Sequence, residues 1–182
     1  NNTDVYFDET NKRMVMNFRN NYSRLAEALF QKGDTVKAIQ TLDKCMMEFP
    51  RDVVNLSYFA IPIIDIYCKL GEDAKGKELL ATMIDDYLTE IKYLKEFDKE
   101  SGLKQNINIA GQVLGSLVRV LQMHKLEDSN YSYSTKDGKY YKHLLGDSKS
   151  VTITDTEIGD GIEVNYATYR INTFMDEYLS IQ

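Results

Sequence analysis

The stretch Tyr22–Pro50, YSRLAEALFQKGDTVKAIQTLDKCMMEFP, decides the fold of this chain. Two amphipathic helical patterns meet within it at a short Lys-Gly-Asp turn, and a proline ends the second pattern. Apolar residues that recur every three or four positions predict helices with one apolar face. The stretch therefore predicts an αα-hairpin, whose two antiparallel helices need a neighbouring element to bury their apolar stripes.

The packing positions of this hairpin follow the order found in a tetratricopeptide repeat. That repeat has an aromatic-leucine-small-bulky series, a turn glycine, a small-bulky-small series and a closing proline. The matching residues here are Tyr22, Leu25, Ala26, Leu29, Gly33, Ala38, Leu42, Cys45 and Pro50. The hairpin thus resembles one tetratricopeptide repeat, and the resemblance implies a scaffold of stacked hairpins in which these positions serve packing and carry no catalytic chemistry.

The bulk composition is that of a globular protein. The chain has 182 residues, 43% of them hydrophobic and 27% charged, which suits one domain with an insertion. Its net charge of −6 argues against binding to nucleic acid or anionic membranes, because both need a basic face. No apolar run approaches the roughly 18 residues of a membrane span. Since the sequence opens with Asn1 and lacks an initiator methionine, we expect a fragment or a processed chain.

The helix that leads into the hairpin is predicted to be long. Asp8 or Thr10 would cap its start, and it would reach about Lys32. Its apolar stripe consists of Met14, Phe18, Tyr22, Leu25 and Leu29. Gly33 would close this helix in the left-handed conformation, and Asp34 or Thr35 would cap the next one.

A second, weaker copy of the hairpin follows. A helix centred on Ile63, Ile64 and Tyr67 tolerates Pro62 if the proline lies in its first turn. The turn Lys69–Asp73 repeats the first one at slightly more than the usual spacing of about 34 residues. In the following helix, the positions of Ala38, Leu42 and Cys45 are taken by Gly76, Leu80 and Met83.

Two longer helices and a compositional change complete the chain. The fourth helix is predicted over residues 73–97, and a fifth around residues 107–121 should pack against it in antiparallel fashion. Residues 131–142 predict a β-hairpin with an Asp-Gly turn, and residues 151–154 a further short strand. A last helix is predicted at about residues 166–180.

The predicted fold class is therefore all-α. It consists of tetratricopeptide-like stacked helical hairpins, about six helices in all, with a small β-hairpin-containing insertion before the last helix. The predicted domains are helical repeats over residues 1–126, a tyrosine-rich insertion over 127–165, and a C-terminal helix over 166–182 that packs on the repeats.

Few residues are candidates for chemistry. Cys45 and Cys68 are interpreted first as buried thiols, and a disulfide between them is the alternative in an oxidising compartment. His124 and His143 lack partners at ligand spacing, and residues 154–161 only resemble a calcium loop in composition. We expect no catalytic residue, no metal site and no cofactor.

A candidate interaction surface comprises four tyrosines of the insertion together with one arginine of the first helix. Tyrosine offers a large contact area at low entropic cost and is frequent at interfaces. The alternative, which we favour for the tyrosines, is cross-strand aromatic packing that holds the small hairpin together. The residues of this candidate surface are Arg19, Tyr131, Tyr133, Tyr140 and Tyr141.

A narrower resemblance covers about residues 3–97. The segments Val5–Asn11, Leu25–Leu29, Ala38–Cys45 and Tyr67–Glu72 are similar to the C-terminal soluble region of large multi-spanning bacterial membrane proteins. Those proteins resemble protein O-mannosyltransferases. The resemblance implies that the transferase chemistry lies in a membrane region preceding this fragment, so no catalytic position is carried over.

The function implied by this resemblance is that of a non-catalytic interaction or scaffold domain on the periplasmic side of the inner membrane. Its repeat groove would hold a protein or peptide partner, including a glycosylation acceptor, and only the preceding region would contact the membrane. The alternative is a free-standing periplasmic adaptor that binds peptide or glycan. An enzyme with an acidic site in the insertion ranks last.

Overall fold

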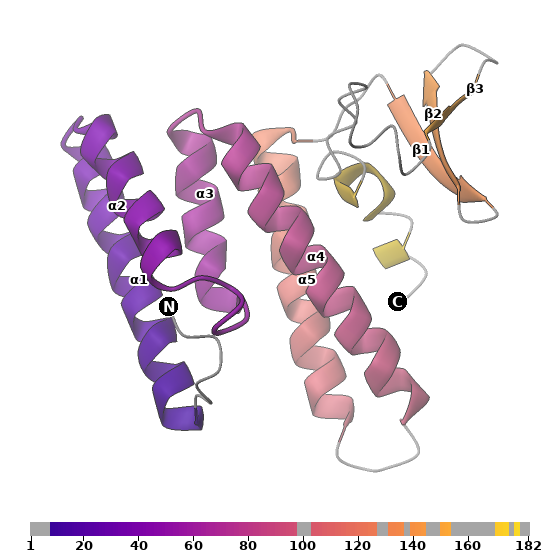
Figure 1. Cartoon of the computed structure of the whole chain (residues 1–182), viewed down its shortest axis with the longest axis horizontal. Helices are drawn as coiled ribbons and strands as arrows, with labels where there is room; N and C mark the ends of the chain where they lie inside the picture. Colours follow the sequence, from indigo (N-terminus) through magenta and orange to yellow (C-terminus); the bar gives the residue numbers. More distant parts are fainter. Residues whose placement is uncertain are drawn as a thin grey trace. The chain divides into compact units, whose positions relative to one another are not determined.

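The computed structural model describes residues 8–97, 103–126, 131–136, 139–144, 150–153, 170–174 and 177–178. This part of the chain is predominantly helical, as predicted (Figure 1). The chain forms two compact units, residues 1–76 and 77–182, which divide near the start of α4. The helices are α1 (Glu9–Gln31), α2 (Thr35–Glu48), the 3₁₀ helix η1 (Tyr58–Ala60), α3 (Ile61–Lys69), α4 (Asp73–Glu96) and α5 (Lys104–His124).

The predicted boundaries of the first hairpin are confirmed. Asp8 is the N-cap of α1, and its side chain accepts a 2.7 Å hydrogen bond from the backbone N–H of Asn11. Gly33, at a φ of 80°, ends α1, because a residue without a Cβ adopts this left-handed conformation without strain. Asp34 then caps α2 by accepting a bond from the N–H of Lys37.

The turn between α3 and α4 has the same geometry as the turn between α1 and α2. Gly71 also has a φ of 80°. The N–H of Asp34 donates to the carbonyl of Leu29 at 3.0 Å, and the N–H of Glu72 donates to that of Tyr67 at 2.9 Å. Two segments distant in sequence therefore close their helices with equivalent hydrogen bonds.

Small residues let the helices of the first unit approach one another closely. Ala26 of α1 and Ala38, Leu42 and Cys45 of α2 are fully buried. A Cβ added to Gly76 would lie 2.6 Å from the Sγ of Cys68, so α4 begins in tight contact with α3. Pro62 lies in the first turn of α3, where the missing N–H breaks no helical hydrogen bond.

The buried face of α1 differs from the predicted one. The residues of α1 that are buried are Val15, Arg19, Ser23 and Ala26. Met14, Phe18 and Leu25, which belong to the predicted stripe, are 50%, 44% and 52% exposed. Valine, serine, alanine and one arginine thus occupy the covered side of α1, and larger apolar side chains lie beside them at the surface. The expectation that Leu25 is a packing position is therefore wrong for this chain taken alone.

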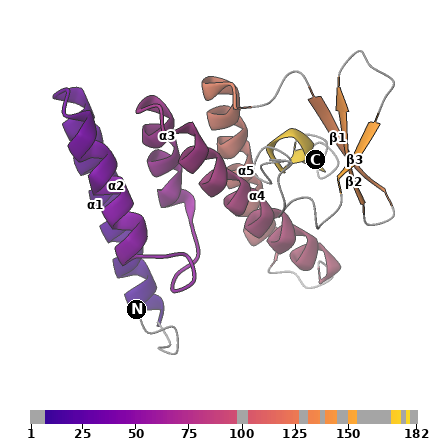
Figure 2. The same cartoon turned by 45° about the horizontal axis from the view of Figure 1, so that its top comes forward.

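The second unit contains most of α4 together with α5. These two long helices run beside each other in both views (Figures 1 and 2). Residues 170–174 and 177–178 are also helical. The buried apolar residues of this unit include Leu80, Ile84, Leu88, Ile91, Leu114, Leu117, Leu121, Ile171 and Phe174.

Three short strands form one antiparallel sheet in the order β1-β2-β3. They are β1 (Tyr131–Lys136), β2 (Lys139–Leu144) and β3 (Ser150–Ile153). β1 pairs with β2 in a register that places Tyr131 opposite Leu144 and Lys136 opposite Lys139. The predicted Asp-Gly turn at 137–138 and the segment 154–161 that resembles a calcium loop in composition lie outside the described residues.

Candidate functional site

A cavity of about 760 Å³ lies along α5 in the second unit. Its lining comes almost entirely from one helix, with single residues from α4 and from the C-terminal helical segment. The lining residues are Ile91, Ile107, Asn108, Gly111, Gln112, Leu114, Gly115, Ser116, Arg119 and Tyr178. Its volume is within the range typical of ligand pockets, which makes this groove a candidate site.

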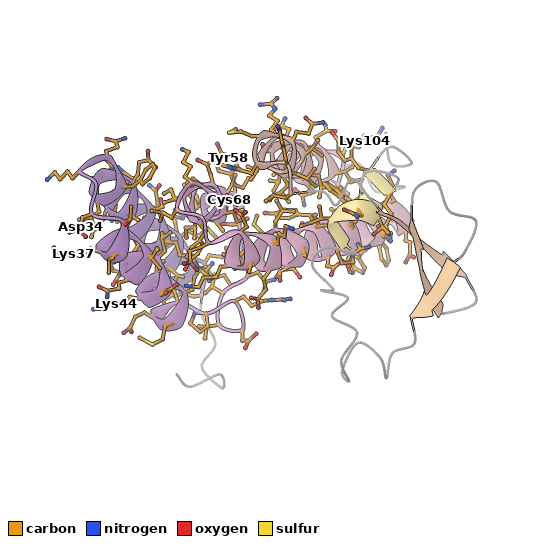
Figure 3. The ribbon with its side chains drawn as sticks, turned by 90° about the horizontal axis from the view of Figure 1, so that it is seen from above. Asp34, Lys37, Lys44, Tyr58, Cys68 and Lys104 are labelled. Atoms are coloured by element: carbon orange, nitrogen blue, oxygen red, sulfur yellow. The ribbon has the colours of Figure 1, made fainter. Side chains whose placement is uncertain are left out.

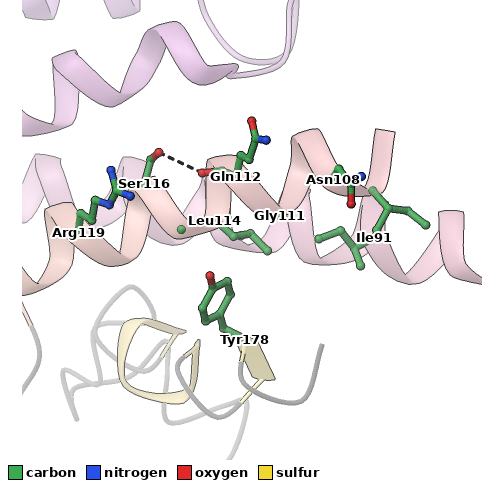
Figure 4. Close-up of a pocket in the computed structure, with 10 residues that line it drawn as sticks. Ile91, Asn108, Gly111, Gln112, Leu114, Ser116, Arg119 and Tyr178 are labelled. Carbon is green, nitrogen blue, oxygen red and sulfur yellow. Dashed lines mark hydrogen bonds between the residues drawn. The ribbon is translucent and has the colours of Figure 1, made fainter. Parts of the chain in front are cut away.

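Two glycines of α5, Gly111 and Gly115, line the groove. A Cβ added to Gly111 would meet nothing within 4 Å, whereas one added to Gly115 would lie 3.4 Å from the hydroxyl of Tyr178. The Tyr178 ring packs against Phe174 at a centroid distance of 5.7 Å, and Figure 4 shows its hydroxyl pointing at α5. Tyr178 therefore lines the groove at Gly115, while the helix surface at Gly111 stays open.

A row of polar side chains follows the same helix beside the glycines. Asn108, Gln112, Ser116 and Arg119 lie along α5 (Figure 4), and Asn108, Gln112 and Arg119 are exposed. The hydroxyl of Ser116 donates to the carbonyl of Gln112 at 3.0 Å. Within the described residues, the side chains of Asn108, Gln112 and Arg119 make no hydrogen bond or ion pair.

A buried ionic cluster joins the C-terminal segment to α4. Arg170 donates to Asp85, and its two Nη atoms lie 3.2 and 3.5 Å from the carboxylate oxygens of Glu177. Burial lowers the pKa of Arg170, but the bonds to Glu177 and Asp85 outweigh burial and raise it. Each charge has a partner, so this cluster is interpreted as a structural anchor.

Arg19 is not part of any surface, which corrects its assignment to the candidate interaction surface. Its side chain is fully buried and donates to the carbonyls of Asn55 at 2.9 Å, Phe49 at 2.9 Å and Val54 at 2.6 Å. These carbonyls belong to the connector between the two hairpins, which has few backbone partners of its own. Burial lowers the pKa of the Arg19 guanidinium, yet the ring of carbonyl oxygens stabilises its charge.

The two cysteines are buried thiols, and the alternative of a disulfide between them is not formed. Figure 3 shows Cys68 among the packed side chains of α3. Burial raises the pKa of Cys45 to about 11, although nearby Arg19 acts in the opposite direction. Because a thiolate is the reactive form of cysteine, Cys45 is an inert packing residue at neutral pH.

A polar network covers the junction of α2, α3 and α4. The hydroxyl of Tyr67 donates to Asp43 at 2.8 Å, and Lys75 lies 2.8 Å from the same carboxylate oxygen. Lys75 also lies 5.6 Å from the centre of the Tyr67 ring. Burial and the bond to Asp43 raise the pKa of Tyr67 well above its usual value. Tyr67 thus stays neutral and serves packing, not proton transfer.

The tyrosines of the candidate surface lie on the two paired strands. The register places Tyr131 opposite Leu144 and Tyr133 opposite Lys142. Tyr140 and Tyr141 are opposite Thr135 and Ser134. No two of these tyrosines are therefore directly opposite each other in the register, and cross-strand aromatic packing stays a prediction. The acidic residues of the insertion lie outside the described residues.

Several large apolar residues of α1 are exposed at helical spacing. We define the α1 apolar stripe as Met14, Phe18, Tyr22 and Leu25. Phe18 stacks on Phe49 with a centroid distance of 5.4 Å, and Tyr22 meets the same ring edge-on at 6.1 Å. The aromatic residue at the end of α2 thus extends the stripe across both helices of the hairpin.

Sequence reasoning did not find the groove on α5. One signal for it was present, because two glycines four residues apart inside a helix cost stability unless something approaches the backbone there. The partner Tyr178 is far away in sequence, and no local pattern connects it with Gly115. Arg119 has no feature in the sequence that separates it from an ordinary surface cation.

Neither a metal site nor a membrane span is found in the described part of the chain. No group of three or more potential ligands gathers there, and none of the described helices is both long and apolar enough to cross a membrane. In comparisons with known proteins, no family model, no curated protein and no solved structure matched this chain.

Proposed function

We propose that this chain is a non-catalytic protein-interaction domain of tetratricopeptide-like architecture, and that it binds a helix of a protein partner on the α1 apolar stripe. One observation carries the proposal. Three large apolar residues at helical spacing on α1, Met14, Phe18 and Leu25, are about half exposed although smaller residues beside them are buried. Exposed apolar surface of this kind marks interaction sites.

The repeated turn geometry supports the architectural part of the proposal. Gly33 and Gly71 have the same φ, and the hydrogen bonds that close their helices are equivalent. The first helices of the two hairpins also approach each other, since the Nζ of Lys69 lies 4.0 Å from Glu27. Helical hairpins related in this way stack and present continuous surfaces to partners.

The chemistry of the stripe favours a helix as the occupant. Residues at spacings of four and seven along α1 form a ridge, and such ridges pack into the grooves of a second helix. The stacked pair Phe18 and Phe49 offers a flat aromatic surface of the type that dominates interface energetics. An amphipathic helix would bury this surface and keep its own polar face in water.

We further propose that the domain is the extracytoplasmic C-terminal part of a membrane glycosyltransferase-like protein, in which it holds an acceptor or partner protein. This part rests on the sequence resemblance alone. The upstream coding sequence tests it: we expect a series of hydrophobic segments of about 20 residues each. An upstream sequence without them would leave a free-standing adaptor. Glycan and peptide arrays, with Tyr131→Ala and Tyr140→Ala variants as controls, test binding by that alternative.

Site-specific photo-crosslinking in the cells of origin tests the interaction itself. A photoreactive amino acid is placed at Phe18 or Leu25, and at Lys44 of α2 as an exposed control (Figure 3). We expect a discrete crosslinked protein from the two stripe positions and none from Lys44. If all three positions give the same products, or none crosslinks, the stripe is not a partner-binding surface.

A further inference from the structure

Besides its two glycines, the groove on α5 is lined by a regular row of polar side chains. Asn108, Gln112 and Arg119 lie on one side of the helix (Figure 4). A helix rises about 1.5 Å per residue, so the row is about 16 Å long. An extended peptide covers that length with about five residues. A single sugar ring or a small organic acid would reach only part of it.

The amides of this row have the right chemistry for a peptide backbone. A carboxamide group carries both a donor and an acceptor, and it therefore pairs with the N–H and C=O of an extended chain at the same time. Asn108 and Gln112 are exposed, and neither makes a hydrogen bond within the described residues. Ser116 is different, because its hydroxyl already donates to the helix backbone.

The charge of the residues that line the groove favours an anionic ligand. Among the described residues that line it, Arg119 is the only ionised one and none is acidic, although the chain as a whole has a net charge of −6. Arg119 makes no ion pair within the described residues. A guanidinium binds a carboxylate through two parallel hydrogen bonds, which adds direction as well as affinity.

Gly111 leaves room for the backbone of a bound peptide to come close to α5. The space above Gly111 is open, and at Gly115 the hydroxyl of Tyr178 already approaches the helix. Tyr178 and the polar row both line this groove, so a bound chain would meet an aromatic ring as well as polar side chains.

We propose that this groove binds an extended peptide segment of about five residues, whose carboxylate meets Arg119. The carboxylate belongs either to an acidic side chain or to a peptide C-terminus. The inference rests on the proposed function as an interaction domain, but it assigns a second surface, separate from the α1 apolar stripe.

A selection experiment on the full chain tests this proposal with peptides of random sequence. Random heptapeptides are displayed in two formats, one embedded between linkers and one ending in a free carboxylate. If the carboxylate is a side chain, we expect enrichment of Asp or Glu at one position in the embedded format. If it is the C-terminus, we expect peptides to be retained in the free-carboxylate format and not in the embedded one. The two formats thus distinguish the two sources of the carboxylate.

The enriched peptide is then synthesised and titrated into the isotope-labelled chain. Its binding should shift the backbone amide signals of residues 108–119. Arg119→Gln should weaken binding by at least about ten-fold, while Arg24→Gln, an exposed arginine of α1, should leave it unchanged. Gly111→Leu, placed where the space is open and the chain can fold normally, should block the groove without altering its charge.

Several results would overturn the proposal. These are an empty selection, a selected peptide that binds the Arg119→Gln variant equally well, and a peptide displaced by glucuronate, which would identify a sugar-acid site. Peptides that bind the α1 apolar stripe and are lost with Phe18→Glu would refute only this inference and leave the proposed function intact. The crosslinking experiment tests the proposed function separately from this inference, because none of its photoreactive positions lies on α5.

Discussion

Arg19 holds the connector between the two hairpins through its side chain. Its guanidinium donates to carbonyls contributed by Phe49, Pro50, Val54 and Asn55. These carbonyls lie in irregular backbone, where no helix satisfies them. A buried charge normally costs stability, but here it is paired with several acceptors at once. The arginine therefore fixes the path by which α2 leads to α3.

Replacement of Arg19 by Met should destabilise the chain by about 3 kcal/mol, because several bonds to a charged donor are lost and the buried carbonyl of Val54 loses this donor. Methionine retains most of the apolar volume, so the loss reports the polar bonds. Urea unfolding measures the difference. Arg24→Met at an exposed site on the same helix should change stability by less than about 0.5 kcal/mol. Equal effects of the two substitutions would contradict this role of Arg19.

Cys45 should make the stability of the chain depend on pH in the alkaline range. Its pKa is about 11 in the folded chain and about 8.5 in an unfolded one. Between these values the unfolded state loses its proton first, so stability is fully present below about pH 8.5 and falls as the pH rises. We expect a loss of about 2 kcal/mol between pH 8 and 10.5 that is absent in Cys45→Ala. If the free energy of unfolding of the wild type and of Cys45→Ala changed with pH in the same way, Cys45 would not be the cause of the pH dependence.

At the scale of the elements, helical spacing in the sequence predicts where each helix begins and ends. Asp8, Gly33 and Asp34 act as predicted, because caps and turn glycines depend on neighbours within a few residues. The choice of face was not predictable in the same way. α1 carries a large apolar stripe beside a row made of Val15, Arg19, Ser23 and Ala26, and only the packing of other elements decides which of the two is covered.

The close contact of α3 with α4 predicts opposite effects of one substitution at two glycines. Alanine normally stabilises a helix interior by about 1 kcal/mol relative to glycine. Gly111→Ala should show this gain, since its Cβ meets nothing within 4 Å. Gly76→Ala should instead lose about 1–3 kcal/mol, because its Cβ would lie 2.6 Å from the Sγ of Cys68.

Thermal or urea unfolding of both variants checks this pair of expectations. A double variant provides the control, because Cys68→Ala removes the sulfur atom and should largely cancel the cost of Gly76→Ala. If the cost persisted in the Cys68→Ala background, the contact would not be its cause.

At the scale of the whole molecule, the sequence predicted a helical scaffold but not its candidate binding surfaces. The groove on α5 needs Tyr178, which lies far from Gly111 and Gly115 in sequence, and this juxtaposition arises only on folding. Arg19 illustrates the reverse case: an arginine in a helical pattern is usually exposed, and only the carbonyls of the connector explain its burial. Interaction surfaces depend on such long-range placement more than helices do.

The chain as a whole thus combines buried small residues between helices with large apolar residues left at the surface of α1. This distribution is the basis of the proposed function, because a partner helix would cover the stripe that the chain itself leaves open. Phe18→Glu and Leu25→Glu place charges on positions that are already about half exposed, so the variant should fold as the wild type does.

The most direct test is the affinity of the partner crosslinked at Leu25, measured by calorimetry with the purified partner and the full chain. We predict that the double variant Phe18→Glu, Leu25→Glu binds at least about ten-fold more weakly than the wild type, and that Lys44→Glu binds equally well. A double variant that binds as tightly as the wild type would contradict the assignment of the α1 apolar stripe as the partner-binding surface.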